Sequence, residues 1–350
     1  MSSAPIRGRG AAGNPANRFE PIHYVSDTED EETHPDTRLY KDTSRTILAQ
    51  NQSPDVGFEF SVNPYRGCEH GCVYCYARPY HEYLGFSAGL DFETRILVKE
   101  DAPQLLRQEL LSPKWKPQTI AISGVTDAYQ PAERRLGITR ACLEVLVEFG
   151  NPAAVVTKNH LVTRDADLMS ELAAKDAASV NLSITTLDAK LQRTMEPRAS
   201  TPSARLAAVR ELSEQGIPVR VMVGPVIPGL TEHEIPSILE AASEAGAVAA
   251  SYILLRLPYG VKNLFESWLE RCYPDRKKRV LNRIRETRGG NLYSSEFHER
   301  MKGTGVYARQ IGELFQVTCR RLGLNRKSMA LSAAAFRRPG EKRQLDLFSE

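Results

Sequence analysis

Three cysteines lie close together in the first quarter of the chain, and their spacing is that of a metal-binding loop. Cys68, Cys72 and Cys75 follow a Cys-x3-Cys-x2-Cys pattern within residues 63–80. Three cysteine ligands on a 4Fe–4S cluster, which normally takes four, leave one iron free to bind another molecule. A zinc site needs a fourth ligand, and His70 lies inside the first loop, where reaching the same ion is cramped. We therefore expect an iron–sulfur cluster, with a zinc knuckle as the alternative.

The residues around these cysteines carry a family resemblance. Cys68-x3-Cys72-x-Tyr74-Cys75 resembles the cluster loop of the radical S-adenosylmethionine (SAM) enzymes. The run Tyr74-Cys-Tyr-Ala-Arg-Pro is similar to the branch of spore photoproduct lyase, the DNA repair photolyase-like enzymes, and the likeness covers residues 45–260. The resemblance implies a 4Fe–4S cluster and SAM as cofactors, and an electron donor such as flavodoxin or ferredoxin. It also implies that an electron from the cluster cleaves SAM to a 5′-deoxyadenosyl radical.

Composition is that of an ordinary globular protein, but the charge is unevenly distributed. The chain has 350 residues, of which 41% are hydrophobic and 25% charged. No run of about 18 apolar residues predicts a membrane span, and the N-terminus has no apolar signal core, so we expect a cytoplasmic protein without a membrane partner. Residues 261–343 hold 20 Lys and Arg against 8 Asp and Glu, a net charge of +12. This basic region could face DNA, or it could be a solvated helical surface.

Strand and helix patterns alternate about six times along the middle of the chain. The apolar runs that we interpret as buried strands span residues 58–62, 119–123, 153–157, 180–185, 219–223 and 250–255. Strands that are buried on both faces and joined by helices favour a parallel sheet. Repeated right-handed crossovers without a reversal of strand order suggest a barrel. Together with the resemblance, this predicts an α/β fold with a partial (β/α)6 TIM-like barrel.

Four regions follow from this pattern. Residues 1–44 are rich in Gly, Pro, Asn and Ser and are expected to be disordered. Residues 45–260 form the barrel, residues 261–333 a basic helical subdomain, and residues 334–350 a flexible tail.

Candidate cofactor-binding residues lie where the predicted strands end, because the chemistry of such barrels sits at the carboxyl ends of the strands. By resemblance, Lys158, Ser123 and Ser183 are the partners of the SAM carboxylate. Tyr74 and the stretch that begins with Gly224 and Pro225 would hold the adenine, and Gly124 and Arg198 complete the predicted SAM site. The alternative for each polar residue is ordinary hydrogen bonding within the barrel.

One departure from the photolyase-like pattern concerns the hydrogen donor. Spore photoproduct lyases resemble one another in carrying a donor cysteine near the end of the second strand, and here residues 121–124 contain no cysteine. Tyr129 lies in the same loop, and its phenol is the candidate catalytic hydrogen donor.

The C-terminus contains a second motif. Gln344-Leu345-Asp-Leu347-Phe348 resembles the short peptide by which bacterial replication and repair enzymes dock on the DNA sliding clamp. Its apolar side chains would enter a groove on the clamp, as short recognition peptides do. The alternative is an unstructured tail.

The sequence thus predicts a radical SAM enzyme that acts on a lesion or a modified nucleotide in DNA. The alternatives are radical SAM modification of RNA or protein, and an iron–sulfur protein that binds nucleic acid without turnover.

Overall fold

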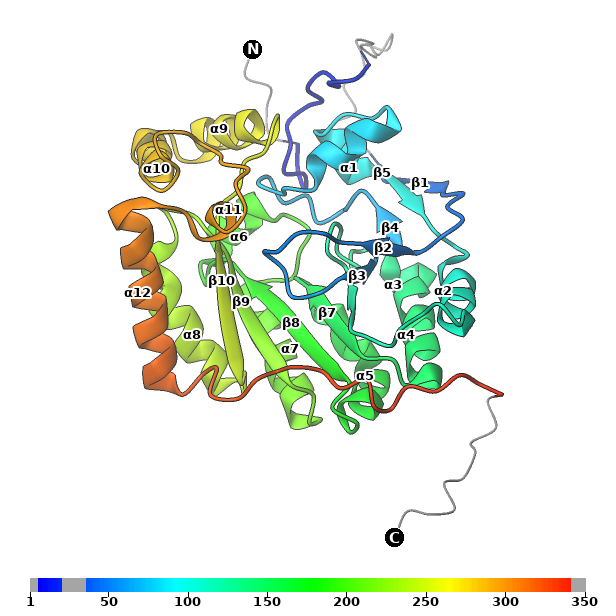
Figure 1. Cartoon of the computed structure of the whole chain (residues 1–350). Helices are drawn as coiled ribbons and strands as arrows, with labels where there is room; N and C mark the ends of the chain where they lie inside the picture. The colour runs from blue at the N-terminus through cyan, green and yellow to red at the C-terminus, as the bar shows by residue number, and fades with distance from the viewer. Residues whose placement is uncertain (1–5, 21–35, 341–350) are drawn as a thin grey trace.

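The computed structural model describes residues 6–20 and 36–340, and its centre is one seven-stranded sheet (Figure 1). Six strands run parallel, each followed by a connection on the outside, and they lie in the sheet in the order in which they occur in the chain. They are β3 (Phe60–Val62), β6 (Ile120–Ile122), β7 (Ala153–Thr157), β8 (Ala178–Ile184), β9 (Val219–Val226) and β10 (Ala249–Leu254). β2 (Leu48–Gln50) pairs antiparallel with β3 at one edge. The prediction of a six-stranded partial barrel is confirmed.

The central strands form because most of their residues are apolar and are buried or half-buried on both faces, as is typical of parallel sheets. Every residue of β8 is buried. Val155 of β7 lies opposite Val180 of β8, which lies opposite Val219 of β9, so branched side chains stack across neighbouring strands. This register fixes the height at which each strand ends, and the carboxyl ends of the strands therefore meet at one edge.

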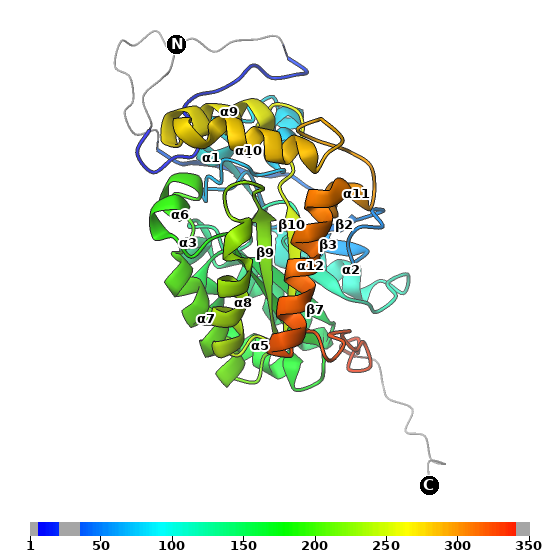
Figure 2. The ribbon, with the colours of Figure 1, turned by 90° about the vertical axis from the view of Figure 1, so that its left-hand side faces the viewer.

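Helices cover the outer face of the sheet (Figures 1 and 2). Those of the barrel are α2 (Ala102–Leu111), α3 (Glu133–Leu136), α4 (Ile138–Phe149), α5 (Ala166–Ala173), α6 (Ala189–Met195), α7 (Pro202–Glu214) and α8 (Ile235–Glu244), with the 3₁₀ turns η2 (His160–Asp165) and η3 (Glu232–Glu234). The helical segment over residues 133–149 is divided into α3 and α4 at Gly137, whose φ of +65° interrupts the helical backbone.

The basic helices beyond residue 260 do not form a separate core. They are α9 (Val261–Cys272), α10 (Pro274–Glu286), α11 (Glu299–Lys302) and α12 (Gly305–Leu322). Phe265 and Trp268 of α9 pack in one apolar cluster with Cys72 and Tyr74 of the cysteine loop. Helix α12 lies against α8 and contributes Phe315 to the main core (Figure 2). The boundary predicted at residue 261 thus separates the barrel from helices that bury their apolar faces against it.

A small second sheet and the N-terminal residues surround the cysteine loop. The sheet consists of β1 (Arg38–Lys41), β4 (Tyr65–Arg66) and β5 (Arg95–Val98), with η1 (Arg78–Leu84) and α1 (Leu90–Thr94) between the last two. The backbone N–H groups of Gly10 and Ala11 donate to the buried carboxylate of Glu93. A Cβ on Gly10 would lie 1.8 Å from the carbonyl oxygen of Gly71. The disorder predicted for residues 1–44 therefore does not hold for residues 6–20 and 36–44, because Glu93 supplies partners for the backbone of Gly10 and Ala11 and β1 pairs with β5.

The chain after α12 returns along the barrel. Asn325 exchanges hydrogen bonds with the backbone of Ala250 at the start of β10. The N–H of Arg337 donates to the carbonyl of Phe149, and the Phe336 ring lies 6.1 Å from that of Phe149. Residues 334–340 of the predicted tail are thus held at the end of α4, whereas the predicted clamp-binding peptide at 344–348 lies outside the described residues. None of the helices in the described ranges is long and apolar enough to cross a membrane.

Candidate cluster and cofactor site

The three cysteines of the motif line one cavity of about 260 Å³ at the carboxyl edge of the sheet. They lie in the loop between β4 and η1, and Cys68 and Cys72 are buried whereas Cys75 is half-buried. Among the residues that the structure describes, no three His, Cys, Asp or Glu side chains are grouped around the position of a single ion. The three thiols line the wall of the same cavity.

Glycines and one buried arginine shape the cysteine loop. Gly71 has a φ of +67°, and a Cβ there would lie 2.7 Å from the carboxylate of Glu93. The guanidinium of Arg78 donates to the carbonyl of Cys72 at 3.0 Å and pairs with Glu93. The N–H of Cys75 donates to the same carbonyl at 3.1 Å. The carbonyl of Cys72 therefore accepts two hydrogen bonds from within the loop, and the bend that these bonds stabilise leaves the thiols on the side of the cavity.

The donor set fits an iron–sulfur cluster. Burial raises the pKa of all three thiols above the usual cysteine value. Thiols in such surroundings stay protonated unless a cation is bound, and a bound metal centre is the charge that stabilises thiolates. Three soft sulfur donors in one sheltered loop are the ligands that such clusters use.

A buried carboxylate, Glu196, lies behind the cavity wall, in contact with Tyr74 and Lys158, which line the cavity. Its oxygens accept hydrogen bonds from the phenol of Tyr74 and from the guanidinium of Arg205, and the ammonium of Lys158 lies 3.2 Å away. Burial by itself would raise the pKa of Glu196, but the charges of Arg205 and Lys158 outweigh burial and hold that pKa well below its usual value. The positive charge of Arg205 thus offsets the negative charge of Glu196. The three groups together carry a net positive charge, and Lys158 presents it on the cavity wall.

Lys158 is fixed at the end of β7. Its ammonium donates to the carbonyl of Gly224 at 3.0 Å and lies 3.3 Å from the hydroxyl of Thr185. Its side chain remains 16% exposed, toward the cavity that it lines. A carboxylate that enters the cavity therefore meets one ammonium whose orientation is already set.

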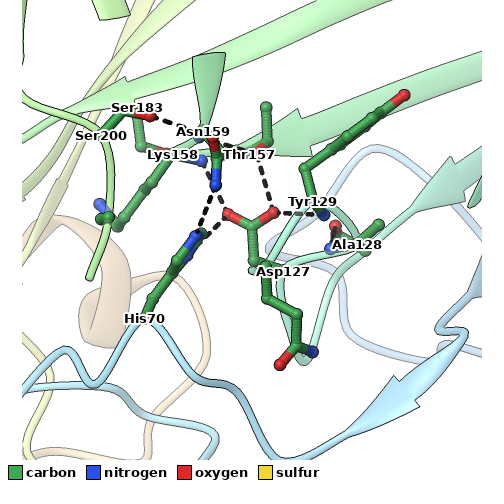
Figure 3. A network of polar contacts seen from close by, with 12 residues as sticks. His70, Asp127, Ala128, Tyr129, Thr157, Lys158, Asn159, Ser183 and Ser200 are labelled. Carbon is green, nitrogen blue, oxygen red and sulfur yellow. Dashed lines mark hydrogen bonds and ion pairs between the residues drawn. The ribbon is translucent and has the colours of Figure 1, made fainter. Parts of the chain in front are cut away.

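A second polar network joins the cysteine loop to the sheet (Figure 3). Asp127 accepts from the N–H of Lys158 at 2.7 Å and from the hydroxyl of Thr157 at 2.7 Å, and it lies 3.3 Å from Nδ1 of His70. The other ring nitrogen of His70 lies 3.2 Å from the side-chain amide of Asn159. His70 is thus occupied in holding the loop against β7.

The other residues predicted to hold SAM fall into two groups. Ser123, Gly124, Ser183, Gly224 and Pro225 line the cavity together with Tyr74 and Lys158. Ser123 has a φ of +89° at the end of β6, and its hydroxyl accepts from the N–H of Ala128 at 3.0 Å. Such a backbone conformation is costly for a residue with a Cβ and is found mainly where the surroundings enforce it.

Arg198 and Tyr129 lie elsewhere. Arg198 pairs with Glu69 at 3.2 Å and does not line the cavity, so it supports the cysteine loop from outside. Tyr129 is fully buried, and its hydroxyl donates to Asp165 at 3.1 Å, away from the cavity lining. Because a hydrogen donor must reach the substrate, the role predicted for Tyr129 does not fit its position.

Two residues at the mouth of the cavity, Tyr76 and Met301, were not assigned to the site from the sequence. Tyr76 lines it, and the guanidinium of Arg256 lies 5.1 Å from the centre of the Tyr76 ring. Met301 of α11 also lines it and accepts a contact of 3.8 Å from Arg256. A signal for Tyr76 was present, because it directly follows Cys75. Nothing in the sequence indicates that Met301 returns to the site.

Comparison with known proteins identifies the family. A model of the Radical SAM superfamily matches residues 62–242, which is more than half of the chain, and the chain belongs to that superfamily. It is a radical SAM enzyme, and members of this superfamily generally use SAM and a 4Fe–4S cluster.

Individual relatives are more distant. The chain is 37% identical over 243 residues to an uncharacterised protein of Mycobacterium tuberculosis, covering 68% of this chain and 70% of that protein. A radical SAM Nalpha-GlyT isomerase of Pseudomonas phage M6 is 22% identical over 281 residues, covering 79% of this chain and 56% of that protein. A solved structure of spore photoproduct lyase complexed with dinucleoside spore photoproduct matches with a TM-score of 0.57 and 16% identity, covering 82% of this chain and 80% of that one. At this identity the match shows a shared fold.

Proposed function

We propose that this chain binds a 4Fe–4S cluster through Cys68, Cys72 and Cys75 and binds SAM in the adjoining cavity. The observation that supports this most directly is that the three thiols and the ammonium of Lys158 line the same cavity. With both cofactors bound, the pair supplies one-electron cleavage of SAM to a 5′-deoxyadenosyl radical. The protein's own contribution is to bind, to orient and to exclude water.

Each part of SAM has a counterpart on the cavity wall. Glu196 and Arg205 offset each other's charge, so the positive charge of Lys158 remains and attracts the carboxylate of SAM. Hydroxyls of Ser123 and Ser183 line the same space, and the Tyr74 ring with Gly224 and Pro225 offers an apolar surface for the adenine. Because these groups are fixed by the sheet and by the buried Glu196, they need little reorganisation when SAM binds.

For the substrate we propose a lesion or a modified nucleotide in DNA. Two observations support this class: the fold shared with a spore photoproduct lyase that was solved with dinucleoside spore photoproduct, and the net charge of +12 over residues 261–343. We propose Tyr76 as the hydrogen donor in place of Tyr129, because Tyr76 lines the cavity, where its hydroxyl donates to the carbonyl of Gly124, whereas Tyr129 is bound to Asp165 away from the cavity lining. DNA is then the main partner, with flavodoxin or ferredoxin as the electron donor.

The experiment that tests this proposal is a product assay on anaerobically reconstituted protein with a chemical reductant. We expect 5′-deoxyadenosine to form, and to form fastest with irradiated or modified DNA in comparison with intact DNA and with RNA. Equal yields on all three would remove DNA lesions as the substrate and leave RNA or protein modification. No 5′-deoxyadenosine under any condition, from protein that carries its cluster, would leave a binding protein without turnover.

A further inference from the structure

Exposed aromatic side chains are concentrated around the mouth of the cavity. Among the described residues six aromatic side chains are exposed, and five of them belong to this region. We call them, together with the arginine that lies over one of their rings, the aromatic rim: Phe19, Tyr76, Tyr80, Tyr83, Tyr259 and Arg256. The five rings are between 39% and 68% exposed. Exposed rings gathered on one surface generally mark a place where something binds.

One half of the rim is a row of tyrosines that begins at the cavity. Tyr76 lines the cavity and directly follows the last cysteine. Tyr80 and Tyr83 lie on η1, and side chains three residues apart eclipse one another in a 3₁₀ helix, so both rings are on the same face. The ring of Phe19 stacks on Tyr83 with 4.7 Å between centroids and 29° between planes. The row thus begins at the cavity with Tyr76 and ends with the stacked pair of Tyr83 and Phe19.

The other half of the rim is the loop after β10. Tyr259 has a φ of +48°, which is unusual for a bulky residue. The guanidinium of Arg18 lies 3.9 Å from the centre of the Tyr259 ring and 5.0 Å from that of Phe19, and it is itself held by Glu82 at 2.6 Å. Arg18 therefore joins the two halves and fixes both rings. A platform that is fixed in this way binds flat groups at little cost in side-chain entropy.

The cation of the rim has no carboxylate partner within the described parts of the chain. Arg256 forms no ion pair there, its Nε is buried without a hydrogen bond, its Nη1 donates to the sulfur of Met301, and its guanidinium lies over the Tyr76 ring. A guanidinium in this state favours an anionic ligand, and phosphate is the anion that its planar donors suit best. Stacking rings and a free guanidinium are together the elements with which proteins bind single-stranded nucleic acid.

We propose that the aromatic rim binds a single-stranded segment of nucleic acid, with unpaired bases stacked on its rings and a phosphate on Arg256. This deepens the proposed function and rests on it in one respect, the identity of the substrate as a nucleotide. A base that is paired and stacked in a duplex cannot reach a cavity of about 260 Å³ beneath the rim. The rim therefore selects unpaired nucleotides before any chemistry takes place.

The test is a binding measurement on the full-length protein with its cluster, by fluorescence anisotropy under anaerobic conditions. The probes are a labelled oligothymidylate of about 12 nucleotides, an oligouridylate of the same length and a blunt DNA duplex, since single-stranded sites span roughly 4–16 nucleotides. We expect the single strands to bind more tightly than the duplex. The two single strands distinguish DNA from RNA. A duplex bound as tightly as the single strands would overturn the proposal.

Substitutions locate the binding surface. Stacking on one ring accounts for about a fivefold to a hundredfold difference in affinity. We therefore expect Tyr259→Ala, and separately the double variant Tyr80→Ala with Tyr83→Ala, to bind the single strand at least about fivefold more weakly than the parent. The matched control is Val317→Ala, an exposed apolar side chain on α12. Iron content and circular dichroism verify that each variant folds. Rim variants that bind as the parent does would contradict the proposal.

Arg256 has its own signature. The plot of log K against log salt has a negative slope. Loss of one phosphate contact makes that slope less steep by about 0.7 for single strands. We expect Arg256→Ala to show this decrease in steepness and Arg256→Lys to retain the parent slope, whereas Arg210→Ala, an exposed arginine on α7 outside the basic region, leaves the slope unchanged. An unchanged slope in Arg256→Ala would remove the phosphate contact. Because these readouts report binding alone, tight single-strand binding without 5′-deoxyadenosine would leave the rim in place and overturn only the proposed reaction.

Discussion

The two sides of the cavity are built on different principles. On the inner side, Glu196 and Arg205 are buried and Lys158 is 16% exposed, and the carboxylate of Glu196 pairs with both cations. On the outer side, Tyr76 is exposed and Arg256 has no carboxylate partner in the described ranges. The inner side resembles a site for one small ligand in one pose, since its groups cannot move without breaking buried ion pairs. The outer side is suited to a ligand that arrives from solvent.

The largest effect is expected at the boundary between the two sides, where the thiols lie. Cys72→Ala should lose most of the iron and all SAM cleavage, because a cluster with two cysteine ligands is not retained. Iron content and the absorbance of the reconstituted protein measure this. The matched control is Cys272→Ala, a half-buried cysteine at the end of α9, which should keep its iron. Full iron content in Cys72→Ala would assign the cluster to other ligands.

Breaking the inner side should cost stability. Arg205→Met removes a buried guanidinium and leaves Glu196 with an uncompensated part of its charge, and the loss of one partner of a buried pair costs about 3–5 kcal/mol of unfolding free energy. Denaturant unfolding measures this loss. The control is Glu171→Gln, which breaks the exposed pair with Lys175 and should cost about 0.3–0.5 kcal/mol. Equal losses for the two variants would mean that the inner network does not stabilise the fold.

Removing the charge that faces the cavity should weaken the binding of SAM and leave the cluster content unchanged. In Lys158→Ala the loss of a charge-assisted contact with a carboxylate costs about 1.5–3 kcal/mol. We therefore expect SAM to bind about tenfold to a hundredfold more weakly. Equilibrium binding of SAM to the reconstituted variant is the measurement, and Lys175→Ala is the control. Unchanged affinity would give Lys158 a purely structural role.

The inner side should also make stability depend on pH. The pKa of Glu196 is lower in the folded chain than its ordinary value near 4.5, since Arg205 and Lys158 outweigh the effect of burial. The unfolded chain therefore binds a proton at a pH where the folded chain does not. The resulting stabilisation is present above about pH 4.5 and is lost as the pH falls, with a slope of up to about 1.4 kcal/mol per pH unit. The difference in unfolding free energy between the parent and Glu196→Gln should shrink on acidification, and a difference that is constant with pH would contradict this.

The smallest effect on catalysis is expected from the C-terminal peptide, which belongs to neither side. We propose that Gln344, Leu345, Leu347 and Phe348 dock on the DNA sliding clamp, and that this raises the local concentration of the enzyme at DNA. The double variant Leu347→Ala with Phe348→Ala should lose clamp binding in a calorimetric titration. It should cleave SAM at the parent rate. Clamp binding that survives the double substitution would exclude this peptide.

The sequence predicted those parts of the molecule that depend on local pattern. Alternating apolar runs located all six parallel strands, and the cysteine spacing located the loop that lines the cavity. Lys158, Ser123 and Ser183 were predicted because they follow strands, and parallel strands end at one edge.

Side-chain partners could not be predicted in the same way. Tyr129 follows the second strand as Asp127 does, yet its ring enters the core and meets Asp165, a contact that depends on how α4 and η2 pack. In the sequence Arg205 is not distinguishable from an exposed arginine on a helix, and only the fold shows that it is buried against Glu196. The contact of residues 9–11 with Glu93 joins segments more than 80 positions apart, and no local pattern indicates it.

The most direct test of the central claim is electron paramagnetic resonance of the anaerobically reconstituted and reduced protein, recorded with and without SAM. If Cys68, Cys72 and Cys75 hold a 4Fe–4S cluster with one open iron beside Lys158, the reduced protein gives a 4Fe–4S signal, and added SAM changes that signal. At a SAM concentration that just saturates the parent, Lys158→Ala should show only part of this change, and more SAM should restore the rest. A protein that retains stoichiometric zinc and no iron, or a cluster whose signal is the same with and without SAM, would contradict the account.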